Sequence, residues 1–226
     1  MHRVPAPARV STSRAGFSLV EMIGVLAIIA ILAVIIVPRV FSTIAASRIT
    51  QAAASTNAIK SAVTDFFGRF GTIPVTNNNS RVDDLLVAAQ LMDSRFVVRI
   101  GNQPTNPPLV GAAWARNAAG AWAAAGGVDQ RQQSRIVSVN ANALVPSAAN
   151  GGNYQLDGVN PIAPGSRVIS AVIVNCTANE ARELSLRLDG ESLTAAAGLA
   201  DNQGKVVYAA PNGAGNTTAW VYLTHQ

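Results

Sequence analysis

Residues 17–37 form an uninterrupted apolar run, which constrains the fold more than any other feature of this 226-residue chain. The run reads FSLVEMIGVLAIIAILAVIIV, and Glu21 is its single charged residue. A helix rises about 1.5 Å per residue, so a helix of this length spans about 31 Å, which matches the hydrocarbon core of a bilayer. We therefore expect a membrane-spanning helix here.

The residues that flank the run predict its orientation and its fate. Basic residues precede it, at Arg3, Arg9 and Arg14, so the N-terminus should stay cytoplasmic while the rest of the chain is exported. A cleaved secretory signal peptide is the alternative, but its apolar region would be about 7–15 residues long and a small-residue cleavage site would follow it. Here the run is longer, PRVFST follows it, and the small residue, Gly16, precedes it. A protease that cuts at Gly16 would leave the apolar segment on the mature chain.

Composition limits the classes of function. Apolar residues make up 49% of the chain and charged residues 13%, which fits a globular domain with a membrane segment. The formal charge is +5, but without the three leader arginines 14 basic residues face 12 acidic ones. The basic balance therefore predicts no nucleic-acid partner, because such binding needs a basic patch or stripe. Cys176 is the single cysteine, so no intrachain disulfide can form, and its place in VIVNC predicts a buried, unreactive side chain.

The stretch AGFSLVEMIGVLAIIAILAVIIVP, residues 15–38, resembles the N-terminal signature of type IV prepilins and of type II secretion pseudopilins. The resemblance implies that a dedicated prepilin peptidase cuts between Gly16 and Phe17, and that Phe17 is then N-methylated. It also implies that Glu21 is the glutamate on which assembly depends. Pro38 matches the proline that ends the apolar stretch, where a proline removes a backbone donor and kinks a helix.

The position of Glu21 has a physical explanation in this setting. A charged side chain within a membrane span costs on the order of 2–3 kcal/mol, and less near the interface. In a filament without lipid, the carboxylate would need a cation, and the free amine of Phe17 on a neighbouring subunit could supply it. We hypothesise that this pair sets the axial register of assembly. The alternative is a polar residue that reaches to the membrane edge.

The domain plan follows from these features. We expect a basic leader over residues 1–16, a membrane or filament-core helix over 17–38, an amphipathic continuation of that helix over 39–70, and a globular domain over 71–226. The amphipathic part has apolar residues largely at helical spacing. They are Val40, Ile44, Ile59, Val63, Phe66, Phe67 and Phe70. The expected fold class is α+β, with the long helix packed on a small antiparallel sheet, as in pilins.

Within the globular domain, the sequence predicts short elements. Amphipathic patterning predicts a helix over 81–92, and TANEARELSLRLDG predicts a second, capped by Thr177 or Asn179, that reaches Leu188 before Gly190. Runs typical of strands occupy 96–100, 135–139, 153–156, 167–176, 205–210 and 218–224. The segment 167–176 should be central, and the last two should form a hairpin.

Residues 101–134 are Ala-rich and poor in charge, so we expect an inserted loop with room for a short helix. Its two tryptophans, Trp114 and Trp122, either cover the domain or contact a neighbouring subunit.

The sequence offers little for catalysis or for a cofactor. Asp83 and Asp84 are adjacent, so they would point to different sides of a helix and suit its dipole better than acid–base chemistry. Asp201 and Asn202 alone cannot supply the oxygens that calcium needs, so we predict no metal and no cofactor. Three N-x-S/T triplets begin at Asn78, Asn175 and Asn216, but such triplets arise readily by chance.

The combined expectation is a filament subunit and not an enzyme. It would sit in the inner membrane with a single span, its C-terminal domain outside the cytoplasm, and then enter a pilus or pseudopilus. Its partners would be other pilin-like subunits, the prepilin peptidase and methyltransferase, and an inner-membrane assembly platform. FGTIP and LDGE resemble pseudopilin turns, although Ile73 replaces the usual aromatic residue, and they favour a type II secretion pseudopilin. A pilus subunit for adhesion, twitching or DNA uptake, and a membrane-anchored enzyme or binding domain, are the alternatives.

Overall fold

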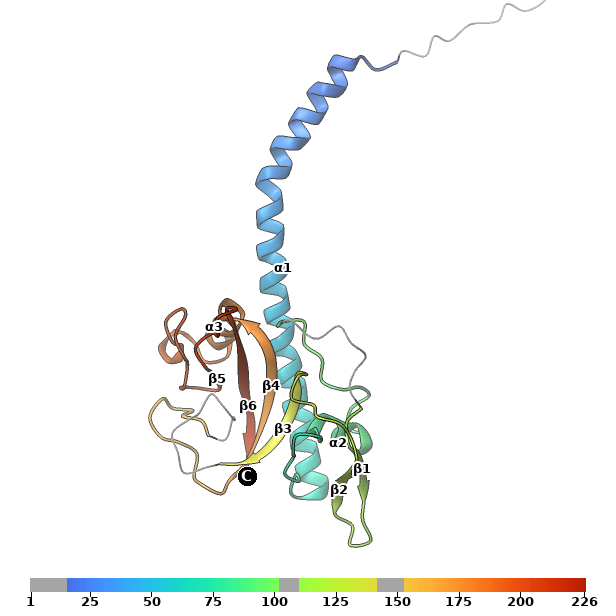
Figure 1. Cartoon of the computed structure of the whole chain (residues 1–226), viewed down its shortest axis with the longest axis vertical. Helices are drawn as coiled ribbons and strands as arrows, with labels where there is room; N and C mark the ends of the chain where they lie inside the picture. Colours follow the sequence, from blue (N-terminus) through green and yellow to red (C-terminus); the bar gives the residue numbers. More distant parts are fainter. Residues whose placement is uncertain (1–15, 102–109, 142–152) are drawn as a thin grey trace, which may run out of the picture. The chain divides into compact units, whose positions relative to one another are not determined.

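A computed structural model of the chain describes residues 16–101, 110–141 and 153–226. The chain divides into two compact units, of which the first ends at Ile44 and the second is Ala45–Gln226. Helix α1 (Leu19–Phe70) passes without a break from the first unit into the second (Figure 1). Except for Gly16, the predicted leader lies outside the described residues, as do residues 102–109 of the predicted insert.

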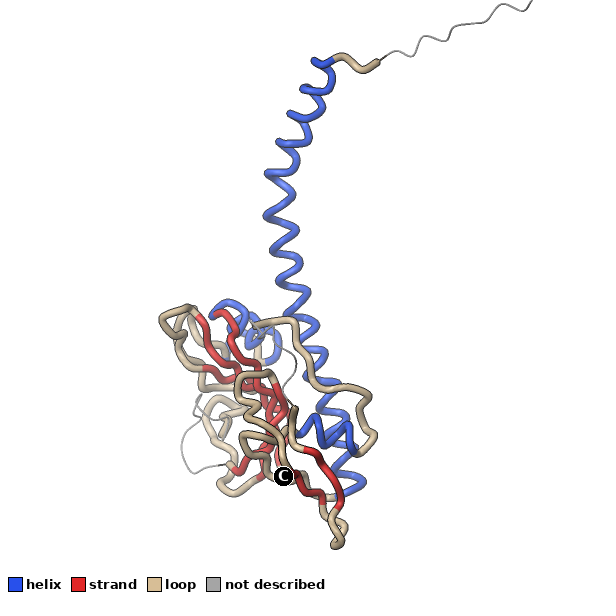
Figure 2. Tube along the Cα trace, turned by 45° about the vertical axis from the view of Figure 1, so that its right-hand side comes forward, coloured by secondary structure: helices blue, strands red, loops and turns tan. Residues whose placement is uncertain are grey.

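The second unit is built around two antiparallel sheets. Its other helices are α2 (Val82–Ala88), α3 (Ala178–Leu188) and the 3-10 helix η1 (Glu191–Leu193). A hairpin is formed by β1 (Ala113–Arg116) and β2 (Trp122–Ala125). The larger sheet contains β3 (Arg135–Asn140), β4 (Arg167–Thr177), β5 (Val206–Tyr208) and β6 (Asn216–His225), in the order β3-β4-β6-β5 (Figure 1). Figure 2 shows the strands of both sheets in red. The predicted α+β class is confirmed.

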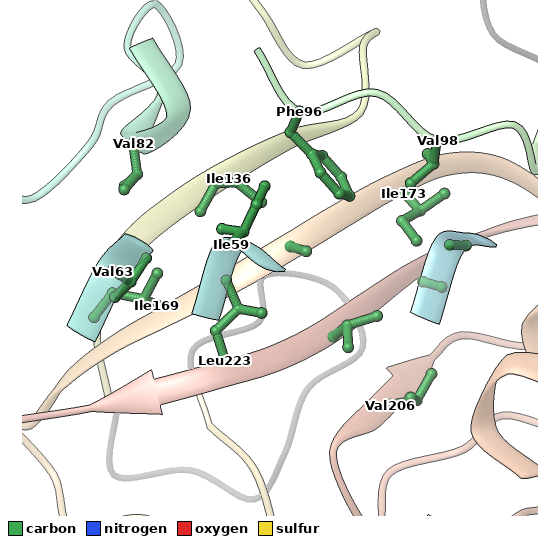
Figure 3. Close-up of a cluster of buried hydrophobic side chains, with 14 of the residues drawn as sticks. Ile59, Val63, Val82, Phe96, Val98, Ile136, Ile169, Ile173, Val206 and Leu223 are labelled. Carbon is green, nitrogen blue, oxygen red and sulfur yellow. The ribbon is translucent and has the colours of Figure 1, made fainter. Parts of the chain in front are cut away.

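One face of the larger sheet packs against the part of α1 that belongs to the second unit (Figure 3). The buried residues of the helix recur every three or four positions, so one stripe faces the sheet. They are Ile49, Ala52, Thr56, Ile59, Ala62, Val63 and Phe66. Phe67 and Phe70 are partly buried against the same cluster, as predicted for the end of the stripe. The stripe begins later than predicted, because Val40 is 47% exposed and Ile44 is 42% exposed.

Strand β4 is buried on both faces, which explains its nearly continuous apolar sequence. Ile169, Ala171 and Ile173 belong to the cluster beneath α1, whereas Val168 and Val172 belong to a second cluster on the opposite face. The predicted central position of this strand is confirmed, since β3 and β6 pair with its two edges. The predicted C-terminal hairpin is also confirmed, by the antiparallel pairing of β5 with β6.

Residues 96–100 were predicted to form a strand, but the structure has an extended loop there. Phe96, Val98 and Ile100 are buried in the first cluster, and the residues between them are exposed. The Phe96 N–H donates to Asp83 Oδ2 at 3.1 Å instead of to a neighbouring strand. The alternation of buried and exposed side chains therefore arises in an extended loop that is not hydrogen-bonded to a neighbouring strand.

The prediction of a strand at 153–156 is also wrong, because this segment bonds locally. The Ile162 N–H donates both to Asn153 Oδ1 at 2.9 Å and to the Tyr154 carbonyl at 3.1 Å. Tyr154 is fully buried in the second cluster and donates its hydroxyl to Ser170 Oγ at 2.7 Å. The segment is thus a loop that closes part of the outer face of the sheet.

The described part of the insert contains a hairpin, whereas a loop with room for a short helix was expected. Its turn is fixed by Asn117, whose Oδ1 accepts the N–H groups of Ala119 and Ala121, both at 3.0 Å. Trp114 is buried and donates its indole N–H to the Arg81 carbonyl at 2.9 Å. Trp122 packs edge-on against Phe70, with ring centroids 5.6 Å apart. Both tryptophans therefore cover the domain, which was one of the two roles expected for them.

The expected start and end of α3 are confirmed in detail. Thr177 and Glu180 form a capping box, in which each side chain accepts the other's backbone N–H, at 3.2 and 2.9 Å. Gly190 has a φ of 80° two residues after the helix ends, a conformation that favours glycine. Cys176, just before the cap, is buried as predicted, and burial raises the pKa of its thiol to about 12. Helix α2 is shorter than predicted, because Gln90 takes a left-handed φ of 58°.

Candidate functional site

The N-terminal half of α1 exposes a continuous apolar surface. From Phe17 to Val37, every large hydrophobic side chain is at least 47% exposed. Among the described residues, α1 is the one helix long and apolar enough to cross a membrane, and the most apolar part of it is not buried at all. Soluble monomers rarely leave patches of this size open to water, so lipid or other apolar helices must cover this surface.

Glu21 lies in the first turn of α1 and caps that helix. Its Oε2 accepts the Ser18 backbone N–H at 2.8 Å, and Ser18 Oγ accepts the Val20 N–H at 3.3 Å. These contacts satisfy donors that a helix start leaves unpaired, and a carboxylate there also suits the helix dipole. The S-x-x-E pattern of a capping box was present in the sequence, but the prediction for Glu21 considered only assembly and the membrane edge.

The other predicted residues of this segment lie around the cap. Phe17 is 83% exposed and Gly16 is exposed, so the peptide bond between them is accessible in the described chain. A side chain on Gly16 would meet nothing within 4 Å, which means that packing does not demand a glycine at this position. Cleavage at Gly16 and methylation of Phe17 remain predictions.

Pro38 lies inside α1, where the helix continues through it. A proline has no backbone N–H to donate to the carbonyl four residues earlier, so one backbone hydrogen bond of the helix is missing at this point. One turn later, the Arg39 carbonyl accepts hydroxyl groups from Ser42 at 2.8 Å and from Thr43 at 2.9 Å. Such back-bonding tends to bend helices, as does the proline itself, so both features favour a bend near Pro38.

The adjacent carboxylates Asp83 and Asp84 hold separate ion pairs. Asp83 is fully buried with Arg81, whose Nε donates to Oδ1 at 3.0 Å and whose Nη2 donates to Oδ2. Asp84 pairs with Arg95 over 2.6 Å, and burial raises the pKa of the Asp84 carboxyl. The sequence did not reveal the buried pair, although R-x-D at a helix start was a usable signal. Within the described residues, no group of three His, Cys, Asp or Glu side chains is placed to hold a metal ion.

Comparison with known families supports the assignment of the N-terminal segment. Residues 11–37 match the prokaryotic N-terminal methylation motif, which includes Gly16, Phe17 and Glu21. No curated protein and no solved structure gave a significant match to the chain. The motif, the apolar helix and the antiparallel sheets together define a type IV pilin-like protein. The N-terminal segment therefore carries the signature of a type IV pilin-like precursor, which pilins and pseudopilins share.

Proposed function

We propose that this chain is a structural subunit of a type IV pilus-like filament. It is cut after Gly16, methylated on Phe17 and held in the inner membrane by the apolar half of α1, with its N-terminus cytoplasmic and the Ala45–Gln226 unit outside. The inner-membrane assembly platform then moves it into a filament with other pilin-like subunits. One observation carries the proposal: the methylation motif coincides with the Phe17–Val37 segment, in which every large apolar side chain is exposed.

We further propose that the filament is a pseudopilus of a type II secretion system, which supports export of folded proteins. The turns FGTIP and LDGE favour this choice. The alternative is a pilus subunit for adhesion, twitching motility or DNA uptake. A membrane-anchored enzyme is the weakest candidate, because Cys176 is buried and the adjacent carboxylates Asp83 and Asp84 are held in ion pairs with Arg81 and Arg95. The proposed role is structural, with no cofactor.

Mass spectrometry of the N-terminal peptide tests the processing. We expect a chain that begins with methylated Phe17, and Gly16→Leu should leave the leader attached. An intact Met1, or a mature chain that begins beyond Val37, would refute the proposal. Abundance of the mature chain in sheared surface material would favour a pilus, whereas retention with the cell envelope would favour a pseudopilus.

The role of Glu21 can be separated from its role as a cap. Its Oε2 is occupied by Ser18, while Oε1 has no partner among the described residues, so the carboxylate can cap its own helix and still accept a neighbour's amine. Glu21→Gln keeps an oxygen for the cap but removes the charge, and Ser18→Ala weakens the cap but keeps the charge. If the charge sets register, Glu21→Gln should lower filament yield as much as Glu21→Ala, while Ser18→Ala should assemble. Normal assembly of Glu21→Gln would reject the charge pair.

A further inference from the structure

A cavity of about 590 Å³ opens on the face of the larger sheet that is turned away from α1. Its volume lies within the range of about 300–1,000 Å³ that is common for small-molecule sites. Several segments of the second unit line it: the loop that begins at Thr76, the turn at Arg131, strand β3, the second half of β4, the turn between β5 and β6, and the first half of β6. None of the functions proposed above uses this cavity.

The cavity contains a buried cation without a carboxylate partner. Arg135 is 7% exposed, and among the described residues no acidic group lies within ion-pair distance of it. Its Nη1 donates to the carbonyls of Gln130, Arg131 and Gln133 at 3.1–3.3 Å, but its buried Nε has no hydrogen-bond partner in the described chain. Burial, followed by the charge of Arg81, lowers the pKa of Arg135 to about 10. Asp129 and Asp83 act against this lowering, and the guanidinium is still charged at neutral pH. A buried cation without an ion-pair partner favours an anionic ligand.

Amide and hydroxyl groups line the same cavity. The side chains of Asn78, Asn216 and Thr218 line the cavity and make no hydrogen bond to other described residues, so their polar atoms are available to a ligand. Asn175 of β4 also lines the cavity, and it takes a left-handed φ of 54° within an irregular stretch of the pairing with β6. The three N-x-S/T triplets of the sequence thus bring their asparagines to one cavity.

The floor of the cavity is apolar. Val137, Val172 and Val174 form it together with Trp220, all from the second hydrophobic cluster. An aromatic ring and branched side chains beneath a ring of amides suit a ligand that has one apolar face and many hydroxyl edges. A sugar ring has this character, and a sugar that also carries a carboxylate would match the buried guanidinium.

We propose that this cavity binds an acidic saccharide, with the carboxylate at Arg135, the hydroxyl groups on the Asn78–Asn216 rim, and the sugar face on Trp220. An acidic peptide is favoured less, because in the described part of the chain Arg135 is the one lining cation without an ion pair: Arg131 also lines the cavity, but it is paired with Asp129 at 2.7 Å, and the other polar lining residues are neutral amides and hydroxyls. The inference concerns ligand binding by the second unit and does not depend on whether the filament is a pilus or a pseudopilus.

Calorimetric titration of the full chain in detergent micelles tests the proposal. The probe is an oligogalacturonate of three or four sugars, and its methyl ester is the matched neutral ligand. We expect the acid to bind, and the ester to bind about tenfold more weakly, since hydrogen bonds to a charged group are worth about 1.5–3 kcal/mol. Equal binding of acid and ester, tighter binding of tetraglutamate, or no binding of the acid would overturn the proposal.

Variants locate the site. Arg135→Gln should abolish binding, but it replaces a buried residue, so Asn78→Asp serves as the variant at an exposed position. The new carboxylate at the rim should weaken oligogalacturonate binding about tenfold through repulsion. Asn202→Asp, the same change at an exposed position outside the cavity, should leave binding unchanged.

A second cavity, lined by Arg69, Arg116 and Arg167, could also attract the anion. Arg116→Gln distinguishes the two cavities, and it should have no effect. Loss of binding in Arg116→Gln together with normal binding in Asn78→Asp would overturn the assignment to the first cavity.

Discussion

Replacing Asp83 with alanine measures how far one buried carboxylate holds three segments of the domain together. Both carboxylate oxygens are occupied: Oδ1 accepts Arg81 Nε at 3.0 Å and the Ile136 N–H at 3.3 Å, while Oδ2 accepts Arg81 Nη2 and the Phe96 N–H at 3.1 Å. The side chain therefore joins the start of α2 to the 96–100 loop and to β3. None of these donors reaches water easily, because the side chains of Arg81 and Asp83 are 3% and 0% exposed.

The expected cost follows from what the substitution leaves behind. Asp83→Ala strands a buried guanidinium and two backbone N–H groups, and removal of one partner of a buried pair costs about 3–5 kcal/mol. For a domain of this size, each kcal/mol lowers the melting temperature by about 2–4 °C, so we expect a decrease of about 6–20 °C. Asp84→Ala is the matched control. Its partner Arg95 is 34% exposed and can be solvated, so the cost should be about 1 kcal/mol or less.

Thermal and urea unfolding of the full chain in detergent, followed by tryptophan fluorescence, provides the measurement. Trp114 is a suitable reporter because its indole N–H donates to the Arg81 carbonyl. The double variant Arg81→Met/Asp83→Leu should recover only part of the loss, since the N–H groups of Phe96 and Ile136 would remain without acceptors. If Asp83→Ala were no more destabilising than Asp84→Ala, the proposed role of Asp83 would be refuted.

Three further predictions concern the same domain. Thr177→Ala removes the cap of α3 and should cost about 0.5–2 kcal/mol of unfolding free energy in urea titrations, and an unchanged midpoint would contradict the capping geometry. Gly127→Ala should cost more than Gly126→Ala, because both have positive φ but only the Cβ at Gly127 would lie 2.4 Å from the Ala112 nitrogen; equal melting temperatures would count against this difference. The thiol of Cys176 has a folded pKa of about 12 against 9.0 when unfolded, so the unfolded state loses its proton first as pH rises. Between these values the wild type should lose about 1.4 kcal/mol of stability per pH unit more than Cys176→Ala, and parallel pH profiles would disprove the linkage.

The sequence predicted the features that depend on long or repeated patterns. The apolar run, the stripe from Ile59 to Phe66, the apolar β4 and the Thr177–Gly190 helix were predicted because each is determined by its own residues. The segments 96–100 and 153–156 were predicted wrongly for a common reason. A strand needs a partner for its backbone, whereas alternating burial needs only a nearby core, and local sequence cannot distinguish the two.

The missed contacts are those that join distant segments. Arg81 and Asp83 are neighbours in sequence, but the groups that complete their site come from Phe96, Ser134 and Ile136. The candidate saccharide cavity likewise brings together residues near 78, 135, 175 and 216. The hairpin at 113–125 was missed for a different reason. Asn117 and Gly120 are typical turn residues, but the alanine-rich segments on either side of them do not resemble strands.

The buried stripe of α1 also has a mechanical consequence. A force transmitted along this helix reaches the second unit through side chains from Ile49 to Phe66, which are spread over about 26 Å of helix axis. Such a force acts parallel to the helix–sheet contact and loads its side chains together. The contacts at one end therefore cannot break one by one before the rest. Many apolar contacts must slip at once before the helix can leave the sheet, so the domain should resist a steady pull without needing a disulfide.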